Sequence, residues 1–385
     1  MPGLHPDIDP DGLLEYSVVY TDRALNHMSR KFQGVMQDIS GVLKEAYHAR
    51  SAIVVPGSGS FGMEAVARQF AGGKKALVLR NGWFSFRWSQ ILDMGRIATS
   101  HSVLKARPIA AGRQAAFAPA PLNEVLAAIR EQRPDVVFAP HVETAAGLVL
   151  PDDYLRAVAT AVHEVGGLFV LDCIASGALW VDMQASGVDV LVSAPQKGWS
   201  GSPGCAFVML GERAHAALAG TTSSSFAMDL KKWLQIMESY ENGSHMYHTT
   251  MPTDALTRCR DAMLETRAAG FERLRAAQNE LGRKVRALFA GKGLRSVAAE
   301  GFHAPGVVVC YTDDDGLHSS KAFAAAGLQT AAGVPLQCDE PADYKSFRVG
   351  LFGLDKLQNI ERTVATLARA LDAAMGTDAA ARAAA

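Results

Sequence analysis

Short apolar runs that alternate with helical segments constrain the fold of this chain more than any other feature. Such runs occur at 51–55, 75–79, 135–139, 168–171, 188–193 and 206–210. Between several of them, and ahead of the first, apolar residues recur at helical spacing over 30–45, 63–70, 84–94 and 153–165. Strands that are apolar on both faces are typical of a sheet with helices on both sides. We therefore expect an α/β fold with a mostly parallel central sheet.

The last third of the chain has a different pattern, which predicts a smaller α+β unit. Its expected elements are a long helix broken near Gly270, two strands and two further helices, at 253–288, 307–311, 346–350, 319–326 and 356–375. The first residues are polar and turn-rich and suggest an arm. The expected parts are thus an arm over 1–25, a large domain over 26–270 and a small C-terminal domain over 271–385.

The composition excludes several classes of protein. Of the 385 residues 49% are hydrophobic, and 38 basic against 39 acidic residues leave a net charge of −1. The chain therefore has neither the low hydrophobicity of a disordered protein nor the basic excess of a dedicated nucleic-acid binder. No run approaches the roughly 20 apolar residues of a membrane span, and the first residues do not resemble a signal peptide. We expect no nucleic-acid or membrane partner.

The cysteines indicate a reducing compartment. They are five in number and widely spaced, without a CxxC pair: Cys173, Cys205, Cys259, Cys310 and Cys338. This pattern favours neither a disulfide framework nor a zinc cluster. We expect a cytoplasmic protein without a metal site.

A glycine-rich segment, GSGSFG at 57–62, follows the first strand and precedes a helix. It fits the GxGxxG pattern of dinucleotide sites, where backbone N–H groups contact a phosphate at a helix N-terminus. A dinucleotide site also needs an acid at the end of the next strand, and here that strand ends in Leu79-Arg80-Asn81. The missing acid weighs against a dinucleotide and favours a tight turn or the site of a different phosphate-bearing cofactor.

Two charged residues follow strands that should end at the same edge of the sheet. Asp172 directly follows the run at 168–171, and Lys197 follows the run at 188–193. Ligands bind at this edge in open α/β sheets. Alone, Asp172 could cap a helix and Lys197 could be a solvated loop residue. With a phosphate loop they match pyridoxal phosphate, which needs a lysine for its Schiff base and an aspartate to keep its ring nitrogen protonated.

Motifs along most of the chain strengthen this interpretation. They are GSGSFGMEA at 57–65, NGWFSFR at 81–87, HVETAAG at 141–147, LDCIAS at 171–176, SAPQK at 193–197 followed by SPG at 202–204, YHTTMP at 247–252 and FRVG at 347–350. In this order the chain resembles the class V aminotransferases of fold type I, in particular the alanine–glyoxylate and serine–pyruvate branch. The resemblance runs from about residue 26 to about residue 370 and implies a transaminase that uses pyridoxal 5′-phosphate, bound in the large domain.

The resemblance implies that five residues contact the cofactor ring or its aldehyde. Lys197 would carry the cofactor as a Schiff base and move protons, and Asp172 would hold the ring nitrogen. Phe84 would stack on the ring, Thr144 would face its hydroxyl, and Ile174 would line the site.

The phosphate and the substrate are assigned in the same way. Ser58, Gly59, Ser60 and Gln196 would hold the phosphate. In the family the tyrosine and the second threonine of YHxTxP reach the phosphate of the neighbouring subunit, so Tyr247 and Thr250 imply a homodimer with shared active sites. Arg348 would bind the substrate carboxylate as a bidentate pair. We expect His141, Arg87 and Glu143 to be structural.

The chain departs from the family where a substrate side chain would lie. Residues 7–20 lack the usual glycine–proline loop, Ala145 and Ala146 replace hydroxyl residues, and the loop 333–340 is atypical. The expected reaction transfers an amino group from a small amino acid to an oxo acid such as glyoxylate or pyruvate.

Two alternatives to a transaminase remain open at this point. One is a cysteine desulfurase or other pyridoxal lyase of the same fold, with Cys338 as the nucleophile; the lack of a stacking histidine within 81–87 weighs against a desulfurase. The other is a nucleotide-binding or non-catalytic α/β module, in which Lys197 would have no chemical role.

Overall fold

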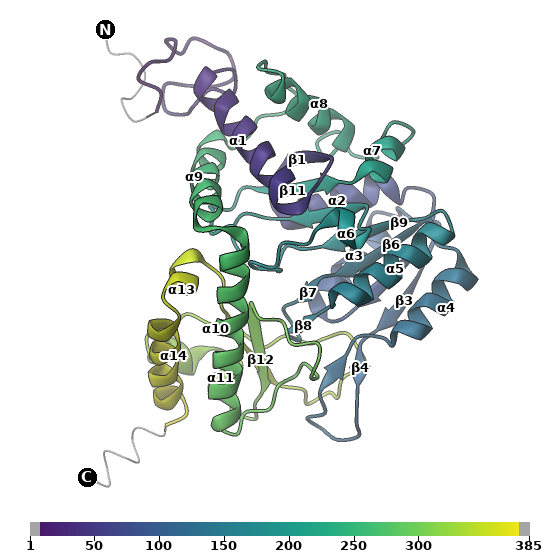
Figure 1. Cartoon of the computed structure of the whole chain (residues 1–385), viewed down its shortest axis with the longest axis vertical. Helices are drawn as coiled ribbons and strands as arrows, with labels where there is room; N and C mark the ends of the chain where they lie inside the picture. The colour runs from purple at the N-terminus through teal and green to yellow at the C-terminus, as the bar shows by residue number, and fades with distance from the viewer. Residues whose placement is uncertain (1–7, 377–385) are drawn as a thin grey trace.

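The computed structural model describes residues 8–376 and confirms the α/β fold (Figure 1). The predicted arm and small domain therefore extend beyond the described part, since 1–7 and 377–385 lie outside it. A seven-stranded sheet forms the centre of the molecule. Its strands, in order across the sheet, are β1 (Ser51–Pro56), β11 (Cys205–Leu210), β10 (Val190–Ser193), β9 (Leu168–Asp172), β6 (Val136–Pro140), β2 (Lys75–Arg80) and β3 (Ser100–Lys105).

The sheet is mostly parallel, as predicted. Strands β10, β9, β6, β2 and β3 pair in parallel, and β11 lies antiparallel to both β1 and β10. Strand β1 therefore points the same way as β9 and β10, so their carboxyl ends meet at one edge. The edge strand β3 was absent from the predicted set because its sequence, SHSVLK, is half polar and largely half-exposed.

Helices cover both faces of the sheet, as predicted. In Figure 1, α4 (Leu122–Gln132) and α5 (Asp152–Glu164) lie in front of it, and α2 (Gly59–Phe70) and α3 (Trp83–Met94) lie behind it. Short elements lie between these strands and helices in the chain. They are α6 (Met183–Ser186), α7 (Glu212–Leu218) and the two-stranded ladders β4 (Arg107–Pro108) with β5 (Phe117–Ala118) and β7 (Val142–Glu143) with β8 (Leu148–Val149).

Helix α1 (Arg30–Tyr47) begins where the sequence predicts. The hydroxyl of Ser29 accepts a hydrogen bond from the backbone N–H of Phe32 at 3.1 Å, which caps the first turn. Its apolar face, including Phe32 and Ile39, is fully buried. Helices α8 (Leu230–Glu241) and α9 (Thr253–Ala269) pack against it.

The predicted long helix is broken at Gly270, whose φ of 87° ends α9 and precedes α10 (Phe271–Gly291). The break coincides with the predicted domain boundary, and the division into domains stays a prediction. A small antiparallel sheet follows, and the expected final helix is split in two at Asn359. The elements of this region are β12 (Val307–Tyr311), β14 (Ser346–Gly350), β13 (Ala331–Ala332), α11 (Asp315–His318), α12 (Lys321–Ala325), α13 (Leu354–Gln358) and α14 (Ile360–Ala374).

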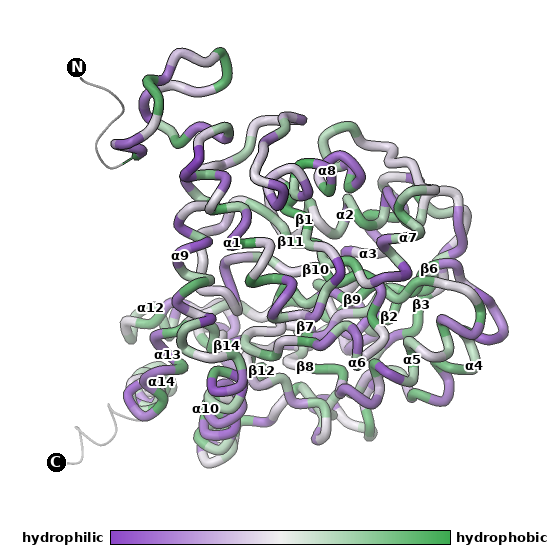
Figure 2. Tube along the Cα trace, turned by 45° about the horizontal axis from the view of Figure 1, so that its top comes forward, coloured by the Kyte–Doolittle hydropathy of each residue, from purple (hydrophilic) through white to green (hydrophobic). Residues whose placement is uncertain are grey.

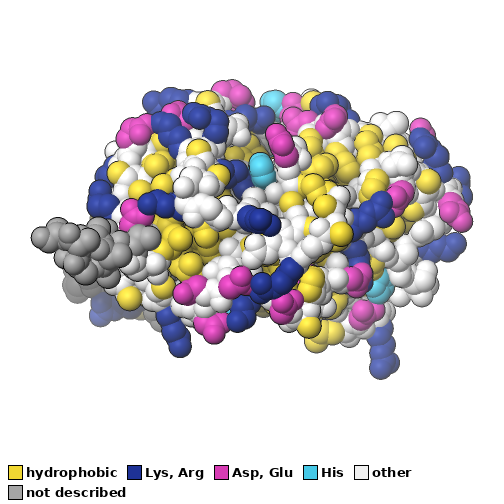
Figure 3. All heavy atoms as spheres, turned by 90° about the horizontal axis from the view of Figure 1, so that it is seen from below, with side chains coloured by type: hydrophobic (Ala, Val, Ile, Leu, Met, Phe, Trp, Pro, Cys, Tyr) yellow, Lys and Arg dark blue, Asp and Glu magenta, His cyan; other side chains and the backbone are white. Residues whose placement is uncertain are grey.

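Hydropathy follows this layering. Figure 2 shows apolar segments gathered in the central strands, whereas outer helices such as α10 and α14 mix polar and apolar residues. Over the face shown in Figure 3, basic and acidic side chains are interspersed, in keeping with the net charge of −1. Among residues 8–376, no helix is both long and apolar enough to cross a membrane.

Candidate active site

One pocket at the carboxyl edge of the sheet collects most of the predicted site residues. It is lined by Ser58, Gly59, Ser60, Met63, Phe84, Arg87, Val142, Thr144, Asp172, Ile174, Ala175, Gln196 and Lys197. The predicted phosphate, ring and Schiff-base residues are thus brought together. A larger hollow of about 1180 Å³ lies along the N-terminal segment and is lined by none of them.

The start of α2 forms an anion-binding corner of this pocket. Gly57 turns the chain with a φ of 120°, and Ser58 stands at the N-cap, where its side-chain oxygen accepts no capping hydrogen bond. The first helical bond runs from the N–H of Gly62 to the carbonyl of Ser58 at 3.1 Å, so the preceding N–H groups have no helical acceptor. A helix start with free N–H groups and two serine hydroxyls attracts a phosphate.

Glycine at 59 allows close packing in this corner. A Cβ there would lie 2.6 Å from Cδ1 of Ile174, so the Ile174 side chain would have to shift to admit it. The backbone of α2 therefore lies directly against the segment that follows β9.

Asp172, the last residue of β9, is a buried carboxylate with a strongly shifted pKa. Its Oδ1 accepts a hydrogen bond from the N–H of Ile174 at 2.9 Å. Burial raises the pKa of Asp172 to about 7, and the charge of Glu143 adds to this; the Ile174 N–H, Lys197 and Arg87 act in the opposite direction. A carboxylate in this setting is stabilised by a cation placed against it.

Lys197 lies at the pocket with its pKa lowered. Burial is the main cause, the positive charges of Arg348 and Arg87 add to it, and Asp172 opposes it. A lowered pKa increases the fraction of neutral amine, which is the nucleophilic form. Lys197 Nζ also lies 5.9 Å from the ring centroid of Phe352.

The loop that carries Lys197 is held by an aromatic cluster. Trp199 packs against Trp180 with a centroid distance of 4.4 Å, and both contact Phe271 and Tyr47. The hydroxyl of Tyr47 donates to Oγ of Ser193 at 3.2 Å, at the end of β10. The lysine is therefore mounted on a rigid element, as a residue that positions a reacting group requires.

Glu143 fixes the start of α3 and with it the ring of Phe84. Its fully buried carboxylate accepts hydrogen bonds from Ser85 N at 2.8 Å, Ser85 Oγ at 2.7 Å, Ala145 N at 2.9 Å and Phe84 N at 3.3 Å. A structural role for Glu143 was expected. His141, also expected to be structural, shares a hydrogen bond with Ser176 Oγ at 2.7 Å.

Arg348 on β14, in the C-terminal part of the chain, lies beside Phe84 but is not among the residues that line the pocket. Its guanidinium carbon lies 5.4 Å from the ring centroid of Phe84, and its Nε donates to the carbonyl of Ala332 at 2.8 Å. Burial lowers the pKa of Arg348, and the charge of Glu143 opposes this. The Nε bond orients the guanidinium, and within the described residues its terminal nitrogens have no hydrogen-bond partner.

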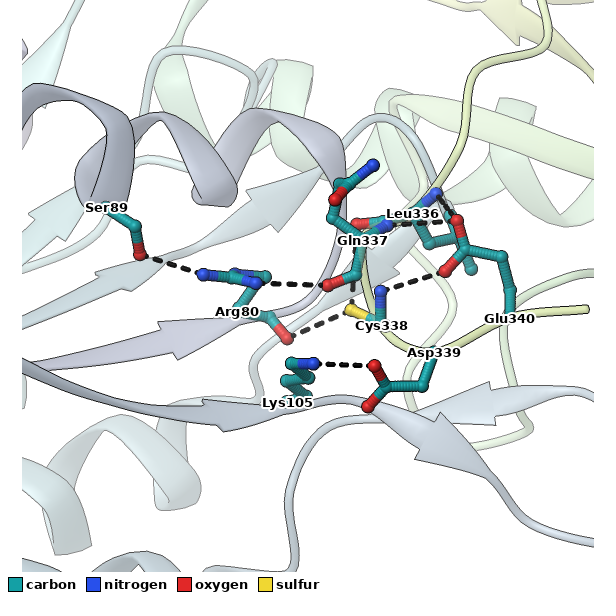
Figure 4. A network of polar contacts seen from close by, with 8 residues as sticks. All are labelled: Arg80, Ser89, Lys105, Leu336, Gln337, Cys338, Asp339 and Glu340. Atoms are coloured by element: carbon teal, nitrogen blue, oxygen red, sulfur yellow. Dashed lines mark hydrogen bonds and ion pairs between the residues drawn. The ribbon is translucent and has the colours of Figure 1, made fainter. Parts of the chain in front are cut away.

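Cys338 is buried in a network that pins the loop 336–340 (Figure 4). Its Sγ donates to the carbonyl of Arg80 at 3.4 Å, and its side chain is 2% exposed. Burial, together with the charges of Glu143 and Glu340, raises the pKa of the thiol to about 12. A thiol of this kind is not a nucleophile on a mobile loop, which the desulfurase alternative requires.

The same loop is held from both sides. The Glu340 carboxylate accepts hydrogen bonds from the N–H groups of Leu336, Gln337 and Cys338 at 2.6, 3.0 and 2.8 Å. Arg80 at the end of β2 donates to the carbonyl of Gln337 at 3.3 Å, which ties the loop to the central sheet. Figure 4 shows both sets of contacts.

Tyr247 and Thr250 lie apart from the pocket, on the exposed segment between α8 and α9. The Tyr247 side chain is 54% exposed, and its hydroxyl lies 3.3 Å from Thr250 Oγ1. Neither residue lines the pocket of its own chain. Their predicted contact with a partner subunit stays a prediction.

Four pocket residues were not among the predicted cofactor or substrate contacts: Met63, Val142, Ala175 and Arg87. Arg87 carries a sequence signal, because it follows Phe84 by three residues and residues with this spacing share one face of a helix. The other three lie within three residues of a predicted contact. Their apolar side chains show no spacing or charge that would mark them as pocket residues in the sequence.

Comparison with known proteins finds similar sequences. The family described as aminotransferase class-V matches residues 13–303. The 2-aminoethylphosphonate–pyruvate transaminase of Burkholderia ambifaria is 30% identical over 327 residues, which cover 83% of this chain and 82% of that protein.

Solved structures share the fold. The alanine–glyoxylate aminotransferase of Nostoc sp. superimposes with a TM-score of 0.72 at 21% identity, over 90% of this chain and 89% of that one. The pyridoxamine–pyruvate aminotransferase of Mesorhizobium loti gives a TM-score of 0.76 at 18% identity, over 97% of this chain and 90% of that one.

Proposed function

Because the chain belongs to the class V aminotransferase family and is a transaminase, we propose that it uses pyridoxal 5′-phosphate bound in this pocket. The amino group passes from a small amino acid or similar amine to an oxo acid such as glyoxylate or pyruvate. One observation carries the proposal: Lys197, Asp172 and the free start of α2 line a single pocket. The names of the relatives, which include pyruvate and glyoxylate, support the choice of acceptors.

The donor groups of the pocket fit this cofactor. The helix start at Ser58 to Ser60, together with Gln196, suits a phosphate. Asp172, whose pKa is raised by burial, is suited to face a protonated ring nitrogen, because a positive charge there would stabilise its carboxylate. Lys197, whose pKa is lowered by burial, is suited to react with an aldehyde, because more of its amine is neutral. When bound, pyridoxal phosphate supplies that aldehyde and an electron-withdrawing ring.

Each side chain then has a defined task. Lys197 Nζ would hold the cofactor and, once the substrate amine has displaced it, would move a proton at the Cα atom of the substrate. Asp172 would keep the proton on the ring nitrogen and balance its positive charge. Phe84 would exclude water from the ring, and the hydroxyl of Thr144 would help to orient it. Arg348 binds the anionic group of the substrate through its terminal nitrogens.

Arg348 does not distinguish a carboxylate from a phosphonate. The amino donor can therefore be a small amine that carries either group. Both groups accept two parallel hydrogen bonds from a guanidinium. The screen of donors therefore includes alanine, serine and 2-aminoethylphosphonate, the last because a relative bears its name.

We also propose that the enzyme is a homodimer with shared active sites and that it acts in the cytoplasm. Tyr247 and Thr250 are exposed and lie outside the pocket of their own chain, which supports a contact with the partner's cofactor phosphate. All five cysteines are free thiols, which suits a reducing compartment. Sedimentation of the loaded protein should give the mass of a dimer, and a fully loaded monomer would contradict the shared sites.

The decisive experiment combines absorption with product formation. The wild-type protein reconstituted with pyridoxal phosphate should absorb in the visible, and Lys197→Ala should lose both this band and activity. Lys345→Ala, at an exposed lysine that pairs with Asp315 at 2.6 Å, serves as the matched control and should keep both. A colourless reconstituted wild type would refute the cofactor, and release of sulfide from cysteine without transamination would favour the lyase alternative.

A further inference from the structure

Arg87 is a pocket residue to which the proposed mechanism gives no task. It lies on α3 one turn after Phe84, and its guanidinium carbon is 4.9 Å from the centroid of that ring. Its Nη1 donates to Oγ of Ser60 at 3.2 Å. Arg87 therefore connects the helix that carries the ring-covering residue with the first turn of α2.

The charge of Arg87 has no acidic partner at hydrogen-bond distance. Within residues 8–376 it forms no ion pair, and its bond to Ser60 is its one hydrogen bond. A guanidinium carries five N–H donors, so most of them remain available to a ligand. The nearby acids have other tasks: Glu143 accepts three hydrogen bonds from the start of α3 and one from Ala145 N, and Asp172 faces Lys197 and the Ile174 N–H.

The position of Arg87 selects the ligand group. The bond to Ser60 holds its charge at the free N–H groups of α2, where the helix adds a positive charge of roughly half a unit. A phosphate ester carries about −1.5 to −2 charges at neutral pH, which the helix start alone leaves largely uncompensated. Arg348, the other cation near Phe84, is oriented instead by Ala332 on the C-terminal sheet.

We propose that Arg87 is a ligand of the cofactor phosphate and acts together with Ser60, an inference that rests on the proposed function. Ser60 Oγ accepts the hydrogen bond from Arg87 and directs its own O–H toward the phosphate. Arg87 thus supplies the positive charge of the phosphate site, and Ser58, Gly59 and Gln196 supply neutral donors.

The test compares pyridoxal 5′-phosphate with pyridoxal, which lacks the phosphate. Apo protein is titrated with each compound, and binding is followed by absorption. Arg87→Gln should raise the dissociation constant for pyridoxal phosphate about tenfold to hundredfold, as expected for the loss of a charged hydrogen bond. It should change the constant for pyridoxal less than about twofold. Arg87→Lys keeps the charge and should recover most of the affinity.

Arg130→Gln is the matched control, because Arg130 is an exposed arginine on α4 that pairs with Glu164 at 2.9 Å. It should leave both constants unchanged. An equal loss of affinity for both compounds in Arg87→Gln would show a structural role and overturn the inference. An unchanged affinity for pyridoxal phosphate with a raised KM for the oxo acid would place Arg87 in the substrate site and overturn it too. Failure of the wild type to bind either compound would instead overturn the proposed function.

Discussion

Replacing Asp172 with asparagine should stabilise the apo protein at pH 8 while it removes catalysis. Burial raises the pKa of this carboxyl from 3.8 to about 7. A difference of about three pKa units corresponds to about 4 kcal/mol, which the folded chain loses when it holds the ionised carboxylate without the positive charge of a bound cofactor. Asparagine has the same shape, keeps an oxygen for the Ile174 N–H, and carries no charge.

The effect has a defined pH window. Because the pKa is higher in the folded chain, that chain keeps a proton that the unfolded chain releases between about pH 4 and pH 7. The free energy of unfolding of the wild type should therefore fall relative to Asp172→Asn by about 1.4 kcal/mol per pH unit across this window. Above pH 7 the difference should be constant.

Urea unfolding of the apo proteins at pH 5, 6, 7 and 8, at one protein concentration, measures this difference. Asp182→Asn is a control for which the opposite change in stability is expected. Burial alone would raise the pKa of Asp182, but hydrogen bonds from Ala185 N and His48 outweigh burial, so the pKa is lowered. This variant should be less stable than the wild type at pH 8. A difference between Asp172→Asn and the wild type that does not vary with pH, or a less stable Asp172→Asn at pH 8, would refute the reasoning.

Two further substitutions and one labelling experiment probe the site. Arg348→Gln should raise KM for carboxylate substrates about tenfold to hundredfold in steady-state kinetics, and an unchanged KM would show that the substrate is anchored elsewhere. Cys338 should resist alkylation in the folded protein, as read by mass spectrometry, because burial raises the pKa of its thiol to about 12; rapid labelling would contradict this. Ser85→Ala removes a buried donor to Glu143 and should lower the free energy of unfolding by about 1–3 kcal/mol in urea, and equal stability would show that the contact is dispensable.

The sequence predicts those site residues that follow strands. Asp172 ends β9, and Lys197 and the loop at Ser58 come after β10 and β1; strands that run in one direction end at one edge of the sheet. The edge strand β3 escaped prediction because an exposed edge tolerates polar residues and therefore lacks the apolar run that marks a central strand.

Residues whose role depends on distant neighbours could not be predicted. Cys338 lies in a loop-like stretch, and its burial depends on Arg80, which is 258 positions away in the chain. The spacing of Arg87 from Phe84 indicates a shared helix face, but only the fold places its guanidinium beside Ser60. Such contacts arise from tertiary packing, which local patterns do not encode.

The loop 336–340 has a consequence for how substrate preference could diverge. Its backbone is held by the Glu340 carboxylate and by Arg80, which contact backbone groups, and the side chains of Leu336 and Cys338 are buried beneath it. Gln337 between them is only half-buried, so a substitution there can alter the chemistry of the surface while the path of the chain is kept. Within this loop Gln337 is therefore a natural target for directed evolution of the enzyme, whereas Leu336 and Cys338 belong to the core.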